Sequence, residues 1–185
     1  MAMGIGRLGD PKLVIKRKFR WTIEINTPIG PIPRHFAKVA ARPQLDIDEL
    51  EVNFLNATTW LPGQGKWQPL NVTYSDVADA DMGPLYSWIA SVYDFTQQNP
   101  QSDLPQTEKP GWNGQAILRM YDGCGSPLEE WTLNSCWPQS INFGDLDYSD
   151  SNEATIDLTL RFSEVSYRKL GNCGITINPR CQGCS

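Results

Sequence analysis

Ala154-Thr-Ile-Asp-Leu-Thr-Leu-Arg-Phe162 is the most regular piece of a longer stretch, Gly114 to Tyr167, that decides the fold of this chain. Its apolar face comprises Ala154, Ile156, Leu158, Leu160 and Phe162, and its polar face comprises Thr155, Asp157, Thr159 and Arg161. A period of two sustained over nine residues predicts a β-strand. One face of that strand should contact a core, and the other should meet water or a partner.

Three more strand-like runs belong to the same stretch. They are Gly114 to Gly123, which ends in a turn, Glu129 to Pro138, and Gln139 to Gly144. Turn-rich joints between such runs favour a largely antiparallel sheet. No cluster of catalytic residues interrupts them, so the stretch indicates structural architecture.

Outside this stretch, the N-terminal third predicts further strands. Lys18 to Ile25 alternates and should be the first strand, and Phe36 to Ala41 should be a short second one. Thr27 to Pro33 contains three prolines and is expected to be a loop or an edge connection, because proline cannot donate to a sheet ladder.

A hairpin is expected in the next segment. Leu45 to Trp60 alternates in part, Trp60 to Trp67 has the composition of an exposed glycine-containing hairpin tip, and Pro69 to Tyr74 should be the following strand.

One helix is predicted. Its apolar positions have helical spacing: Met82, Leu85, Trp88, Ile89 and Val92. Asp79 or Asp81 is the expected N-cap. Together with Asp76 these acids also suggest a calcium loop, but the glycine and terminal glutamate of such a loop are absent. Thr96 to Trp112 should be a long polar connection back to the sheet.

Charge is distributed unevenly along the 185 residues. Residues 1–20 carry six basic groups against Asp10, so this segment is +5 while the rest is −10. An acidic body argues against a sequence-specific reader of nucleic acid, since that binding depends on phosphate neutralisation. No segment is long and apolar enough for a membrane span, and the basic N-terminus lacks the apolar region of a secretory signal. We therefore expect synthesis in a cytoplasm and no membrane anchor.

All five cysteines lie in the C-terminal third, at Cys124, Cys136, Cys173, Cys181 and Cys184. Disulfides or free thiols are the first expectation for all of them. For Cys124 and Cys136, packing as small apolar groups is the alternative to pairing with the tail. Cys181 and Cys184 could be half of a zinc site, but no second pair of matching spacing exists. We therefore predict no metal and no cofactor.

Enzymatic functions have little support in the sequence. His35 is the only histidine, and no serine or cysteine motif accompanies it. The carboxylate pairs best suited to glycoside hydrolysis, Glu129 with Glu130 and Asp145 with Asp147, lie in turn-like sequence. Seven tryptophans leave carbohydrate binding open, although their spread over the chain is more typical of core and subunit contacts. We predict no catalytic residue.

Taken in order, three passages resemble the tail tube proteins of contractile-tailed bacteriophages. The first runs from Phe54-Leu-Asn through Gly63-Gln-Gly-Lys-Trp to Tyr74, and the second is the helix Leu85 to Tyr93. The third joins Trp131-Thr-Leu-Asn-Ser-Cys-Trp-Pro138, Leu146-Asp-Tyr-Ser-Asp-Ser-Asn-Glu153 and a strand that leads to Tyr167. The resemblance covers residues 18–168, which leaves a basic N-terminal arm (1–17) and a cysteine-containing C-terminal tail (169–185).

The resemblance implies a mainly β protein, an antiparallel β-barrel or sandwich with one flanking α-helix, which assembles into stacked hexameric rings. Such a tube is enclosed by a sheath protein, follows a tape-measure protein and ends at a baseplate, and phage DNA passes through its lumen in the virion. Thr155, Asp157 and Thr159 would then face the lumen. A baseplate tube initiator and a ring protein of type VI secretion are alternatives within this architecture, and a carbohydrate-binding β-sandwich is the alternative of another class.

Overall fold

The computed structural model describes residues 16–78, 82–93, 111–149 and 151–170. Within them the chain is mainly β, and every strand pairing is antiparallel. The strands are β1 (Trp21–Asn26), β2 (Pro31–Ile32), β3 (Ala37–Ala40), β4 (Leu45–Phe54), β5 (Ala57–Trp67), β6 (Leu70–Ser75), β7 (Gly114–Tyr121), β8 (Pro127–Asn142), β9 (Thr155–Arg161) and β10 (Glu164–Lys169). A short 3-10 helix, η2 (Arg34–Phe36), and one α-helix, α1 (Gly83–Val92), complete the fold.

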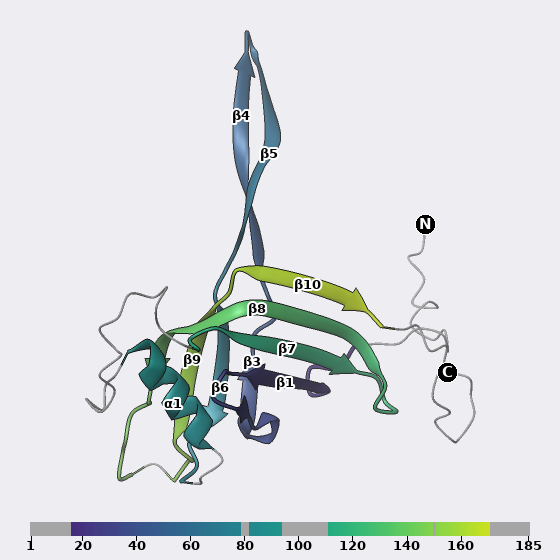
Figure 1. Ribbon diagram of the computed structural model, residues 1–185. Helices are drawn as coiled ribbons and strands as arrows, with labels where there is room; N and C mark the ends of the chain where they lie inside the picture. The colour runs from purple at the N-terminus through teal and green to yellow at the C-terminus, as the bar shows by residue number, and fades with distance from the viewer. Residues whose placement is uncertain (1–15, 79–81, 94–110, 150, 171–185) are drawn as a thin grey trace.

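Eight of the strands form one sheet in the order β2-β1-β7-β8-β9-β6-β3, with β10 also paired to β8. The strand β8 joins its two halves. Residues of β8 up to Cys136 pair with β7 and those up to Asn134 pair with β10, whereas those from Trp137 onward pair with β9. Between these parts the register with β7 shifts, and Ser135 adopts a φ of 53°. A bulge of this kind bends a strand, and Figure 1 shows β8 arching over β9 and β6.

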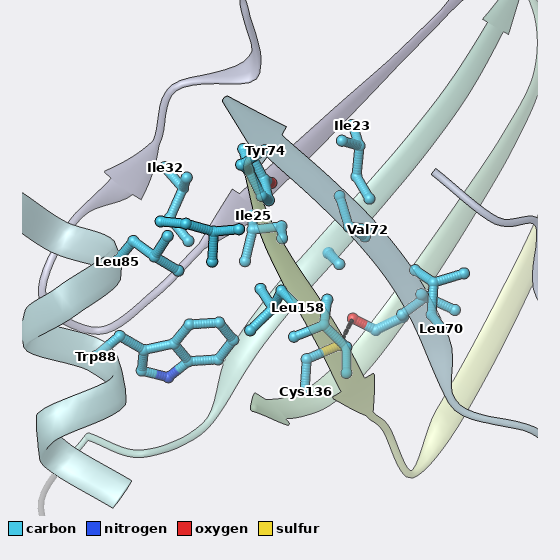
Figure 2. Close-up of a cluster of buried hydrophobic side chains, with 14 of the residues drawn as sticks. Ile23, Ile25, Ile32, Leu70, Val72, Tyr74, Leu85, Trp88, Cys136 and Leu158 are labelled. Atoms are coloured by element: carbon cyan, nitrogen blue, oxygen red, sulfur yellow. Dashed lines mark hydrogen bonds between the residues drawn. The ribbon is translucent and has the colours of Figure 1, made fainter. Parts of the chain in front are cut away.

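The core lies between the two halves of the sheet and α1. It contains Ile23 and Ile25 from β1, Leu70, Val72 and Tyr74 from β6, Leu133 and Cys136 from β8, Ile156, Leu158 and Leu160 from β9, and Leu85 and Trp88 from α1, all at most 1% exposed. Figure 2 shows Trp88 reaching from the helix toward Leu158 and Cys136. The expected inward face of residues 154–162 is confirmed from Ile156 to Phe162.

Trp88 is held at a close approach between helix and sheet. Its indole N–H donates to the carbonyl of Trp112 at 2.8 Å. A Cβ at Gly114 would lie 3.1 Å from Trp88 Cζ2 and 3.0 Å from the carbonyl oxygen of Asn26. Glycine at 114 therefore lets β7 begin directly beneath the tryptophan.

Two local predictions are wrong. The hairpin tip is at Leu55 and Asn56 instead of Trp60 to Trp67, which belongs to β5. Gly63 faces an irregularity in β4, where a Cβ would lie 2.9 Å from the carbonyl oxygen of Asp48, so this glycine marks a close strand approach instead of a turn. The N-cap of α1 is Met82, which makes no side-chain capping bond. Asp79 and Asp81 lie outside the described residues.

Candidate functional site

The β4–β5 hairpin projects from the rest of the molecule as a two-stranded ribbon (Figure 1). Every residue of β4 is exposed, and so is every residue of β5 except Trp67. The exposed large apolar side chains of the hairpin are Leu45, Ile47, Leu50, Val52, Phe54, Leu55, Trp60 and Leu61. A two-stranded hairpin is marginally stable in water by itself, and contiguous exposed apolar side chains mark interaction sites.

Toward its tip the hairpin has two chemically different faces. Cross-strand partners share a face, so Leu50 with Leu61 and Phe54 with Ala57 form an apolar face. The opposite face carries Glu49 and Glu51. Asp48 is paired with Lys66 at 2.6 Å, and neither Glu49 nor Glu51 forms an ion pair within the described residues. The hairpin therefore presents apolar surface and uncompensated negative charge together.

A second surface is the polar face of β6 and β9. The Thr73 hydroxyl donates to Asp157 Oδ1 at 2.6 Å, and the Thr159 hydroxyl donates to Asn71 Oδ1 at 3.0 Å. Thr155, Asp157 and Thr159 thus point away from the core, on one face of the sheet. Arg161 shares this face, so the charge of Asp157 is balanced along β9 itself.

A buried carboxylate lies at the opposite end of β8. Glu129 is 1% exposed and forms ion pairs with Lys16 and with Arg42, the latter at 2.6 Å. These partners come from the segment before β1 and from the connection between β3 and β4. A buried carboxylate is stable only when it is paired and hydrogen-bonded, so Glu129 ties two distant segments to the sheet.

The expectation that Glu129 and Glu130 lie in turn-like sequence is wrong, because both are in β8. Glu130 accepts a hydrogen bond from Arg119 Nε at 2.7 Å, away from the partners of Glu129. This bond is the largest cause that raises the pKa of Arg119. Each carboxylate is thus held by its own arginine, and the two form no catalytic pair.

Asp145, Asp147 and His35 are on the surface. Asp147 accepts bonds from the backbone N–H and the hydroxyl of Ser149, and this bonding lowers the pKa of the carboxyl. The His35 ring lies 4.0 Å from that of Phe36, centroid to centroid. In the part of the chain that the structure describes, no group of three or more histidine, cysteine, aspartate or glutamate side chains could hold a metal.

Cys136 is a free thiol with no exposed surface, and its Sγ donates to the carbonyl of Leu133 at 3.2 Å. Cys136 therefore packs as a small apolar group in the core, and the alternative that it forms a disulfide is wrong. Burial raises the pKa of the thiol to about 11. Cys124 is exposed in the turn after β7. Cys173, Cys181 and Cys184 lie outside the described residues, so disulfide pairing in the tail stays a prediction.

Among residues 16–78, 82–93, 111–149 and 151–170, no helix has the length and hydropathy required to cross a membrane.

No protein-family model matches the sequence. No curated protein matches it either.

Solved structures match the fold. A chain of the extended-state sheath-tube complex of the extracellular contractile injection system PVC aligns with a TM-score of 0.61 at 16% identity, over 91% of this chain and 100% of that one. A chain of the six-fold symmetrised baseplate of the anti-feeding prophage gives a TM-score of 0.57 at 15% identity, over 81% and 93% of the two chains. A crystal structure of an Hcp protein gives 0.51 at 11% identity, over 81% and 90%.

The likeness shows the fold and confirms, at that level, the resemblance found in the sequence.

Proposed function

We propose that this protein is a structural tube subunit of a contractile tail or injection apparatus, built by the packing of many copies of the same chain. The observation that supports this most is the β4–β5 hairpin, which exposes apolar residues on both strands. A sheet edge and an apolar face of this extent are aggregation hazards unless a partner covers them. A second copy is the natural partner, because the fold is that of components of repeating assemblies.

The ring is proposed to contain six copies. The six-fold symmetrised baseplate that contains a chain of this fold supports that number. In a closed ring with cyclic symmetry, every lateral interface is occupied by a neighbouring copy, so further copies can add only along the ring axis. In such a ring the hairpins are free to contact the next ring.

The polar face of β6 and β9 is the proposed channel wall. Thr155, Asp157 and Thr159 are turned away from the core, and the side chains of Asp157 and Thr159 are hydrogen-bonded to Thr73 and Asn71 of β6. A hydroxyl-rich surface of nearly balanced charge attracts phosphate weakly, so it would let DNA pass. Asp157→Lys should slow DNA passage while tubes still form; a loss of assembly with unchanged passage in mixed tubes would contradict this face assignment.

The apparatus we propose is a phage tail, assembled in the host cytoplasm and then part of the virion. A sheath outside the tube is supported by the sheath-tube complex among the matched structures. The tape-measure protein and phage DNA are proposed partners from the sequence resemblance alone. The baseplate match also favours a second candidate, a tube initiator that forms a single ring at the baseplate.

Negative-stain electron microscopy of the purified full-length chain tests the proposal. Stacked hollow rods support a tube subunit. Single rings that never stack favour the initiator. A monomer at all micromolar concentrations, also by light scattering, would contradict both functions and leave the carbohydrate-binding alternative to be tested by glycan binding.

A further inference from the structure

A cavity of about 500 Å³ opens between the edge of β3 and the strands β1 and β7. Its apolar floor contains Trp21, Leu118 and Met120. Trp21 and Met120 are cross-strand partners, and Leu118 lies two residues before Met120, so the three side chains share one face of the sheet. Leu118 and Met120 are buried, and Leu118 belongs to the core. The apolar core of the protein therefore extends to the floor of this cavity.

The rim of the cavity is cationic. Four basic side chains line it, namely Lys16, Lys18, Lys38 and Arg42. They come from the segment before β1, from β3 and from the connection between β3 and β4. Long basic side chains cover apolar surface with their methylene groups and keep the charged end in water. The cavity thus combines an apolar floor with a positively charged rim.

Two of the four cations are held in place by a buried carboxylate. Glu129 is the cross-strand partner of Met120, so it lies on the same face of the sheet as the floor. It is 1% exposed and forms ion pairs with Lys16 and Arg42. The rim is therefore partly ordered before any ligand arrives, which reduces the entropy cost of binding.

The charges of the rim are only partly compensated. Glu129 is shared by Lys16 and Arg42, and Glu153 pairs with Lys38. Lys18 has no acidic partner among the ion pairs of the described residues. Four cations against two carboxylates leave an excess of two positive charges. A phosphate monoester carries roughly two negative charges at pH 7 and therefore matches this excess.

We propose that this cavity binds an amphipathic phosphate monoester, with its apolar group on the floor and its phosphate at the rim. The cavity volume of about 500 Å³ is in the range of small-molecule sites. Both parts of the ligand are required: inorganic phosphate leaves the floor uncovered, and a neutral apolar molecule leaves the excess cations unpaired. The whole cavity belongs to one chain, so the inference goes beyond the proposed function and does not depend on assembly.

Titration of dodecyl phosphate into the dissociated full-length chain, below the concentration at which the amphiphile forms micelles, tests the proposal. Isothermal calorimetry should show saturable binding of one molecule per chain. Dodecyl maltoside has the same alkyl chain without the charge, and inorganic phosphate has the charge without the chain; each should bind at least about tenfold more weakly. Equal binding of dodecyl phosphate and dodecyl maltoside, or no saturable binding of dodecyl phosphate, would overturn the proposal.

Two substitutions locate the site. Lys18→Glu reverses a rim charge that has no ion pair, and Val39→Glu places a negative charge at a lining residue that is 60% exposed. Each should weaken the binding of dodecyl phosphate by about tenfold or more. Arg17→Glu and Leu146→Glu make the same changes at exposed residues that do not line the cavity, so they are the matched controls. Circular dichroism confirms that the variants fold. Equal losses in the site variants and the controls would overturn the assignment to this cavity.

Vesicles distinguish two sources of such a ligand. Co-sedimentation with vesicles that contain phosphatidic acid, but not with phosphatidylcholine vesicles, would identify a membrane lipid, provided that Lys18→Glu abolishes it. Binding of dodecyl phosphate without binding of these vesicles would identify a soluble phosphate ester. Either result supports the site. Vesicle binding that Lys18→Glu and Val39→Glu leave unchanged would contradict it.

Discussion

Strands β9 and β4 have the same alternating composition and opposite surroundings. In β9, Ile156, Leu158 and Leu160 are at most 1% exposed. In β4, Ile47, Leu50 and Val52 are 59%, 57% and 40% exposed. Alternation therefore predicts that a strand has an apolar face, and the tertiary partner decides what covers it. For β9 the cover is the rest of the chain, and for β4 we propose that it is another copy.

The largest expected effect comes from a matched pair of leucine substitutions. Leu158→Ala should lower the free energy of unfolding by about 2–5 kcal/mol, because it removes a buried side chain and leaves a cavity. Leu50→Ala should change it by less than about 0.5 kcal/mol, because Leu50 is exposed in the monomer. Chemical denaturation of dissociated protein measures both, and a large effect of Leu50→Ala would contradict the contrast.

The buried carboxylate sharpens the comparison at the root of the hairpin. Arg42→Met should cost about 1–3 kcal/mol, because Glu129 would keep one of its two cations while remaining buried. Arg34→Met is the matched control: Arg34 pairs with Glu24 at an exposed position, so its loss should cost less than about 1 kcal/mol. Equal effects in thermal unfolding would show that Arg42 is an ordinary surface residue.

The smallest effect concerns Cys136 in the body of the protein. Its pKa is raised to about 11 from 9.0, so the folded state retains a proton that the unfolded state loses. Stability should therefore be unchanged below about pH 8 and should fall by roughly 1 kcal/mol near pH 10. Cys136→Ala removes this dependence, although it costs some packing. A thiol that reacts with alkylating reagents in the folded protein at neutral pH would contradict its burial.

The fold could be predicted from the sequence to the extent that local pattern determines it. The two-residue alternation predicts the inward face of β9, and the helical spacing of apolar residues predicts the apolar face of α1. The structure confirms both faces. The predicted position of the hairpin tip is wrong because a glycine such as Gly63 favours a turn, whereas here its lack of a side chain permits a close approach to the Asp48 carbonyl. Only the pairing of β4 with β5 shows whether this glycine lies in a turn or at a close approach of two strands.

The candidate site was harder to predict. Counting back by two from Leu133 through Trp131 places Glu129 on the inward side of β8, and this signal could have identified it as buried. Its partners could not be found in this way, since Lys16 and Arg42 lie 113 and 87 residues away in the chain.

Hydrogen–deuterium exchange of dissociated and assembled protein tests the central claim most directly. We expect the amides of β8 and β9 to be protected in both states, because the chain itself buries them. Amides of residues 45–67 should exchange rapidly in the dissociated chain and become at least tenfold slower to exchange in the assembly. Hairpin protection that is the same in both states, or an assembly that leaves the hairpin fully exchangeable, would contradict the claim that the hairpin joins one copy to the next.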